Sequence, residues 1–178
     1  MNILKWILIV VLALLAVLVV GGYLLSPKFT VSRSVTINAP ADKVYAFVAS
    51  PRNWKEWSVW NRRDPAMQIE YSGPESGTGS KWSWKSKTQG DGAMTLTATE
   101  PARKVAFDLF FADFGTTSQG QIDFVPDGNT TKVTWTMVGD MGANPMFRWM
   151  ALGADRMVGK DFEGGLANLK AVAEKVTP

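Results

Sequence analysis

The chain has 178 residues, room for one domain of ordinary size, and it contains neither histidine nor cysteine. The absence of cysteine excludes disulfides and thiolate metal sites, and the absence of histidine removes the commonest metal ligand and general base. Nineteen basic against sixteen acidic residues give a net charge of +3, and no long basic run indicates nucleic-acid binding. We therefore expect no metal, no cofactor and no nucleic-acid partner, and the composition favours binding over catalysis.

The amino-terminal segment is apolar enough to cross a membrane. Residues 6–27 carry no charged side chain, and 22 residues in a helix extend for about 33 Å, the thickness of a hydrocarbon core. Trp6 and Tyr23 stand near the two ends, where amphipathic aromatic residues favour the membrane interface. The sequence predicts a transmembrane anchor over residues 1–27 and a separate domain over residues 28–178.

A cleaved signal peptide is the main alternative to an anchor. Its apolar core is typically about 7–15 residues long and ends at a small-x-small site. The apolar core here is longer, and Leu24-Leu25-Ser26 is a poor cleavage site, so an uncleaved single-pass anchor is favoured. Basic residues on the two sides of the span nearly balance. We favour a domain on the outer (periplasmic) face, with the cytoplasmic face left open.

The segment after the anchor begins with one strand and two short helices. Phe29, Val31, Val35 and Ile37 alternate onto one face of a predicted strand at residues 29–38. Asn38 or Pro40 suits the start of a first helix, and a second short helix carries the tryptophans of residues 54–60. Those rings either pack against an edge of the sheet or form a mouth that rests on lipid. Six further strands are predicted at residues 68–72, 80–87, 93–100, 104–111, 119–125 and 131–138.

A long helical region is predicted from Pro145 to about residue 175. Its apolar residues recur at spacings of three and four, which places them on one helix face. Gly153 and Gly159 weaken the helix, so a kink or break between them is expected. The whole order, with strands consecutive and a helix at the end, predicts an α+β fold in which an antiparallel sheet curls around the last helix. The space between them is either a filled core or a cavity.

Several segments together resemble one known superfamily over residues 29–176. They are Val31-x-Arg33-Ser34-Val35-x-Ile37-x-Ala39-Pro40, Asn53-Trp54-x-x-Trp57-Ser58-x-Trp60, Gly79 with Trp82, Val133-x-Trp135, and Lys160-Asp161-Phe162-Glu163-x-Gly165-Leu166-x-x-Leu169. The chain is similar to START-like (SRPBCC) proteins, specifically the bacterial polyketide cyclase/dehydrase group. This resemblance implies a helix-grip fold, a curved antiparallel sheet around a long carboxy-terminal helix with an apolar cavity between them. Members of the superfamily bind lipids, sterols, polyketides and plant hormones, and only some are enzymes, so the resemblance leaves the activity open.

The predicted ligand-binding residues are the large apolar side chains that alternate onto the inner face of the sheet or lie on the last helix. The alternative interpretation of each is a filled core. A high tryptophan content and clustered methionines favour a cavity wall. The predicted set is Trp82, Trp84, Met94, Leu96, Phe107, Leu109, Phe111, Trp135, Met137, Phe147, Met150 and Met157.

No catalytic residue is predicted. Asp108 and Asp123 alternate away from the apolar face, and Asp161 and Glu163 are expected to begin or pack the last helix. The chain has no nucleophile elbow, phosphate-cradling loop or metal-ligand cluster.

The sequence therefore predicts a membrane-anchored binding module whose partner is a lipid, an isoprenoid or a similar hydrophobic small molecule. One alternative is a cyclase- or dehydratase-like enzyme acting on an aromatic substrate, which requires a carboxylate with a raised pKa inside the pocket. The other is a non-catalytic envelope interaction domain with a collapsed core. The oligomeric state cannot be read from the sequence.

Overall fold

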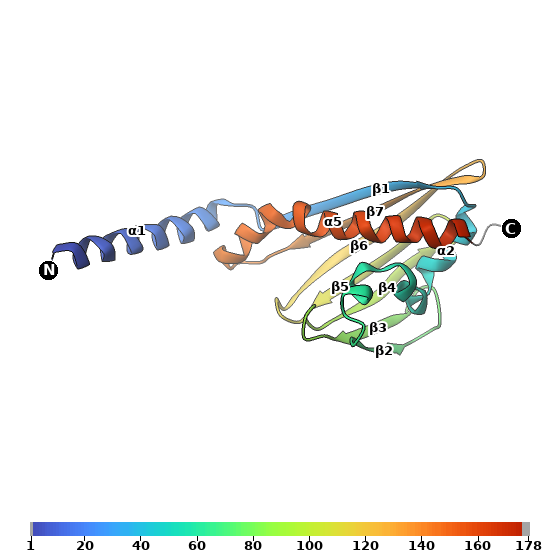
Figure 1. Cartoon of the computed structure of the whole chain (residues 1–178), viewed down its shortest axis with the longest axis horizontal. Coiled ribbons are helices and arrows are strands. Elements are labelled where there is room, and N and C mark those ends of the chain that lie inside the picture. Colours follow the sequence, from blue (N-terminus) through green and yellow to red (C-terminus); the bar gives the residue numbers. More distant parts are fainter. Residues whose placement is uncertain (1, 176–178) are drawn as a thin grey trace.

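A computed structural model describes residues 2–175, so Met1 and residues 176–178, at the ends of the two predicted domains, lie outside the described residues. A seven-stranded antiparallel sheet curves beneath a long carboxy-terminal helix, and a separate amino-terminal helix extends from one end (Figure 1). The elements follow in the order α1 (Asn2–Leu24), β1 (Lys28–Ile37), α2 (Ala41–Ala49), the 3-10 turn η1 (Pro51–Asn53), α3 (Trp54–Trp57), α4 (Val59–Arg63), β2 (Gln68–Ser72), β3 (Lys81–Lys85), β4 (Gly92–Glu100), β5 (Lys104–Phe111), β6 (Thr116–Asp127), β7 (Thr130–Asp140) and α5 (Pro145–Lys175).

The strand order is β1-β7-β6-β5-β4-β3-β2, which confirms the helix-grip architecture. Hairpins join β2 through β7 in sequence, and β1 closes the far edge by pairing with β7. Side chains alternate along the strands between the two faces of the sheet, as the sequence predicts. Phe107, Ile122 and Trp135 turn toward α5 on the inner face, whereas Asp108 and Asp123 lie on the outer face. The one irregularity among the strand pairs is a bulge between Leu96 and Ala98.

The short helices cover one end of the sheet, and their tryptophans cap carbonyl groups at the carboxy-terminal end of α2. The last four carbonyls of a helix lack partners within it, and each of these four accepts a hydrogen bond here. Trp54 Nε1 donates to Val48 at 2.9 Å, Trp57 Nε1 to Phe47 at 3.2 Å, and Asn53 and Gly77 cap the other two carbonyls. Trp54 and Trp57 are buried, so the packing interpretation is confirmed for them and a mouth of these rings on lipid is contradicted.

An aromatic core fills the space between these helices, the sheet and α5. Trp135 stacks on Phe162 with ring centroids 4.0 Å apart and planes 9° apart. The ring centroid of Trp54 lies 5.2 Å from that of Trp82 and 5.6 Å from that of Phe107. The centroids of Trp57 and Trp135 are 5.4 Å apart. Edge-to-face and stacked pairs of this kind add to the stabilisation that comes from burial. We call this cluster the aromatic core.

The last helix is continuous from Pro145 to Lys175, so the predicted break between Gly153 and Gly159 does not occur. Gly159 is needed because the Arg33 guanidinium occupies the place that a Cβ would take. From β1, Arg33 donates to Asp155 at 2.8 Å and to Glu163 at 2.7 Å. Arg63 of α4 makes an ion pair with Asp161. Asp161 and Glu163 thus pack the helix, as the sequence predicts, and the loss of helix propensity at Gly159 is offset by contacts with β1.

Two glycines of α5 should respond oppositely to alanine. At Gly159 the added methyl displaces Arg33 from its two carboxylates, and we expect the free energy of unfolding to fall by about 1–3 kcal/mol. At Gly153 a Cβ meets only the Met157 sulfur, at 3.9 Å, so Gly153→Ala should raise stability by about 0.5–1 kcal/mol through helix propensity. Urea unfolding of the two variants measures both. An unchanged midpoint for Gly159→Ala would show that the Arg33 contacts do not hold α5 in place.

Candidate functional site

The burial of side chains on the inner face of the sheet differs along the length of α5. Beneath the carboxy-terminal part of the helix, Leu96, Val105 and Ile122 are fully buried. Toward its amino-terminal end, Phe29, Trp84 and Phe111 of the inner face are partly exposed although they are large and apolar. Leu109 and Met137 between them are buried. We call this region the open end, defined by Phe29, Trp84, Leu109, Phe111 and Met137 of the sheet with Phe147 and Met150 of α5.

Three inner-face aromatic rings lie across a glycine on the neighbouring strand. Trp84 pairs with Gly92, Phe107 with Gly120, and Phe29 with Gly139. In each pair the ring occupies the place where a glycine Cβ would stand. These rings therefore lie down against the sheet instead of standing up toward the helix. The cross-strand glycines thus make the layer of side chains on the inner face thinner at these three positions, two of which lie at the open end.

The helix and one loop contribute further aromatic residues to the open end. Phe147 of α5 meets Phe114 of the β5–β6 loop edge to face, with centroids 5.7 Å apart, and Phe114 in turn contacts Phe111 at 6.4 Å. This row of three rings joins the sheet to the first turns of α5. Phe114 is 36% exposed, so the row lies at the surface of the molecule. It forms the rim of the open end.

Few polar groups accompany these side chains. Ser118 is 5% exposed and lies opposite Leu109 on the inner face. Deeper, in the aromatic core, Trp135 Nε1 is buried without a hydrogen-bond partner among residues 2–175. Ser80 Oγ, which is also buried, likewise has no partner among these residues. A hydroxyl among apolar walls is typical of a site that binds by apolar burial and orients its ligand with one polar contact.

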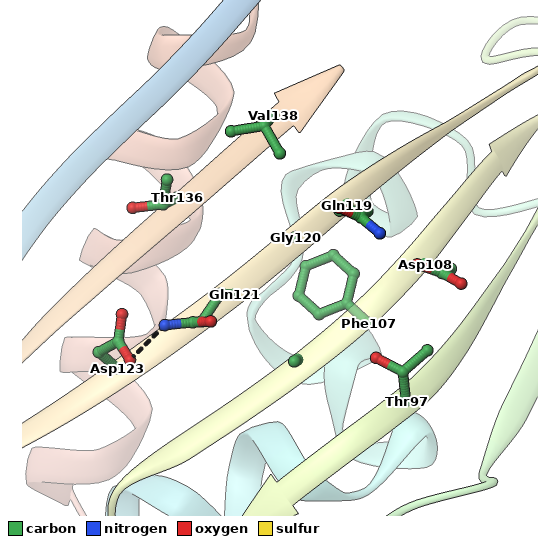
Figure 2. A pocket seen from close by; sticks show the side chains of 10 residues that line it. Thr97, Phe107, Asp108, Gln119, Gly120, Gln121, Asp123, Thr136 and Val138 are labelled. Atoms are coloured by element: carbon green, nitrogen blue, oxygen red, sulfur yellow. Dashed lines mark hydrogen bonds between the residues drawn. The ribbon is translucent and has the colours of Figure 1, made fainter. Parts of the chain in front are cut away.

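The outer face of the sheet carries a different kind of hollow. A depression of about 390 Å3 lies on the face away from α5, and Figure 2 shows Asp108, Gln119 and Gln121 around it. Gln121 donates to Asp123 at 2.7 Å within it. Phe107 and Val138 also line the depression, so it is an open surface of mixed polarity, unlike the apolar open end.

The carboxylates with shifted pKa values are all stabilised in their charged form. Hydrogen bonds from Arg33 lower the pKa of Asp155, and a hydrogen bond from Ser86 lowers the pKa of Asp64. Lys104 lowers the pKa of Glu100, and Lys170 that of Glu174. A carboxyl group with a lowered pKa is a poor proton donor near neutral pH. These four groups are suited to ion pairing and not to general acid catalysis.

The twelve predicted ligand-binding residues fall into three environments. Trp82, Leu96, Phe107 and Trp135 lie in or against the packed aromatic core. Met157 of α5 is 59% exposed and faces solvent. The remaining seven lie at or beside the open end: Trp84, Met94, Leu109, Phe111, Met137, Phe147 and Met150.

Sequence reasoning overlooked Phe29, Phe114 and Ser118 at this end. Phe114 lies in a loop, where alternation has no meaning. Phe29 follows the alternation of β1, but its role depends on facing Gly139 across the β1–β7 pair. Aromatic residues opposite strand glycines were the available signal, and it becomes visible only with the strand register.

Comparison with known proteins places this geometry in a family. The sequence pattern of the family described as polyketide cyclase / dehydrase and lipid transport matches residues 28–174. The chain belongs to this family. Residues 28–174 thus form a hydrophobic ligand-binding or cyclase-type module. None of the curated proteins compared with it matches its sequence.

Solved structures share the fold of this family member. Norcoclaurine synthase from Thalictrum flavum, in complex with dopamine and hydroxybenzaldehyde, is 11% identical with a TM-score of 0.65, over 88% of this chain and 92% of that one. Ara h 8.0201 is 12% identical with a TM-score of 0.60, over 83% and 99%. The di-domain ARO/CYC BexL from the BE-7585A biosynthetic pathway is 17% identical with a TM-score of 0.59, over 85% and 51%. At these identities the likeness shows the fold alone.

Proposed function

We propose that this protein is a membrane-anchored binding module that takes up a lipid, an isoprenoid or a similar hydrophobic small molecule at the open end. The supporting observation is that Phe29, Trp84 and Phe111 are partly exposed on the inner face there, and that the rings of Trp84 and Phe29 lie flat on cross-strand glycines. Removing such an apolar surface from water lowers the free energy of the domain. A chain-like apolar ligand buries it without a change of fold.

Binding would be driven by removing apolar surface from water. Each square ångström of apolar surface that is buried contributes about 25 cal/mol, or about 0.8 kcal/mol for each methylene group. The rings of Trp84, Phe111 and Phe147 supply the wall, and Met137 and Met150 supply adaptable contacts. Ser118 offers the single polar contact that would orient a ligand headgroup.

The anchor in this proposal is α1. From Ile3 to Leu24 it is long and apolar enough to cross a membrane, and its side chains are exposed until the helix meets α5 at Gly21 and Gly22. It joins the domain beside the open end, since β1 and α5 both begin there (Figure 1). Tethering would keep the site close to membrane-derived ligands and raise their effective concentration.

Native mass spectrometry of the fragment 28–178, purified without detergent, tests the proposal. The family match covers 28–174, so this fragment holds the complete domain. We expect a bound mass after incubation with a mixture of phospholipids and isoprenoid alcohols, and organic extraction then identifies its class. A domain that stays ligand-free with every mixture would contradict the proposal and turn attention to the cyclase-type and interaction alternatives.

A further inference from the structure

We propose that the first two turns of α5, residues 145–152, form a second membrane contact that lies in the bilayer interface beside the end of α1. The inference rests on the proposed anchoring by α1 and adds to it a surface of the domain itself. It concerns residues that neither the sequence patterns nor the family match assign to the membrane.

The two helices are in direct contact near the carboxy-terminal end of α1. Trp149 Nε1 donates to the Leu18 carbonyl at 2.9 Å. The edge of the Trp149 indole lies against Gly21, 2.8 Å from where a Cβ would stand, and the Pro145 backbone lies against Gly22 in the same way. The consecutive glycines of α1 thus allow α5 to approach closely, and Figure 1 shows the first turn of α5 beside the end of α1.

The position of the contact along α1 determines how deep the first turns of α5 would lie in the bilayer. Leu18 lies six residues before the end of the helix at Leu24, which corresponds to about 9 Å along its axis. An apolar helix in the interface is buried to about 5–10 Å. If α1 crosses a bilayer, a Trp149 ring bonded to Leu18 lies within the outermost turns of the span. Tryptophan favours this layer because it has an apolar body and one polar N–H.

The side chains of α5 at this depth suit lipid. Met146, Trp149 and Leu152 recur every three residues, which places them on one side of the helix. Their exposed fractions are 48%, 38% and 65%. The neighbouring Phe147 turns the other way and contacts Phe114 at the rim of the open end. One side of these two turns therefore completes the site. On the opposite side Trp149 packs partly against the end of α1, while Met146 and Leu152 are exposed.

Arg148 ties the two elements together at the level of the lipid headgroups. Its guanidinium donates to the Tyr23 carbonyl at 3.1 Å and to the Leu25 carbonyl at 3.4 Å, and it lies 5.6 Å from the centre of the Tyr23 ring. A cation at the carboxy-terminal end of a helix satisfies its unpaired carbonyls and stabilises its dipole. The link holds the open end facing the membrane surface, so that a ligand would pass from the bilayer to Phe147 and Phe111 without crossing water.

The natural absence of cysteine makes a spin-label experiment direct. The full chain carrying Leu152→Cys is labelled with a nitroxide and placed in vesicles of phosphatidylcholine and phosphatidylglycerol. Collision with oxygen, which concentrates in lipid, is compared with collision with a water-soluble nickel complex. Two matched single-cysteine variants accompany it: Val125→Cys, exposed at 57% against 65% for Leu152 but at the far end of β6, and Leu12→Cys in the middle of α1.

We expect the label at residue 152 to behave like the label at residue 12, with frequent oxygen collisions and loss of nickel collisions, while residue 125 shows the reverse. If residue 152 behaves like residue 125 while residue 12 lies in lipid, the second contact is wrong and the anchor stands. Shielding of residue 152 from both reagents means that protein covers it, for example a second copy, and this also overturns the inference. Nickel access at residue 12 overturns both the anchor and the contact that rests on it.

Discussion

Replacing Trp135 with alanine is expected to lower the free energy of unfolding by about 3–5 kcal/mol, because a large ring leaves the aromatic core and a cavity remains. Trp135 is 2% exposed, stacks on Phe162 and meets Trp54 and Trp57 edge to face. Urea unfolding of the fragment 28–178, followed by tryptophan fluorescence and circular dichroism, measures the change.

The matched variants Trp135→Phe and Trp57→Phe separate ring packing from hydrogen bonding. Trp135 Nε1 has no partner, so phenylalanine there removes a buried donor that was already unsatisfied and keeps most of the ring. Trp57 Nε1 caps the Phe47 carbonyl, which would otherwise bond to residue 51, a proline without an N–H. We expect Trp57→Phe to cost about 1–3 kcal/mol more than Trp135→Phe, since it leaves that carbonyl unpaired. Equal losses in both variants would show that Trp135 Nε1 has a partner, such as an ordered water.

The strands could be predicted because half-buried antiparallel strands alternate in sequence. Phe107 and Leu109 share the inner face, and Asp108 lies between them on the outer face, as the pattern of residues 104–111 indicates. The break expected between Gly153 and Gly159 does not occur, because intrinsic helix propensity does not decide the structure there. Contacts between Arg33 and two carboxylates of α5 outweigh the propensity of Gly159.

The division of the inner face into a packed core and an open end could not be predicted. Phe107 and Phe111 lie on the same strand with the same parity, yet Phe107 is buried and Phe111 is partly exposed. The difference comes from the short helix that carries Trp54, which covers one end of the sheet and not the other. The place of a helix above a sheet depends on long-range packing that alternation does not record.

Two methionines of α5 show that helix periodicity does not predict burial either. Met150 and Met157 were predicted together as cavity residues because both are apolar and lie on one helix. Seven steps along the helix separate the two residues, nearly two full turns, so spacing alone places both on one face. Met157 ends at the solvent-exposed surface, whereas Met150 stays partly buried. Facing solvent, Met157 supplies a control for the ligand site.

Phe147→Glu should lower the affinity of the fragment 28–178 for its apolar ligand at least tenfold, whereas Met157→Glu should leave the affinity unchanged. Both substitutions place the same charge on the same helix, but Phe147 lies at the open end against Phe114 and Met157 is 59% exposed. A carboxylate facing an apolar ligand loses its hydration without gaining a partner, which costs several kcal/mol, and each 1.4 kcal/mol corresponds to about a factor of ten in Kd.

Titration with the ligand class identified by mass spectrometry, followed by intrinsic fluorescence, gives Kd for both variants. Urea midpoints close to that of the unsubstituted fragment show that each variant is folded. Equal affinities for the two variants would place the ligand away from the open end. A loss confined to Phe147→Glu would locate the ligand between the first turns of α5 and the rim formed by Phe111 and Phe114. The flat-lying rings of Trp84 and Phe29 explain why the ligand would lie there, because they leave room between the sheet and the first turns of α5.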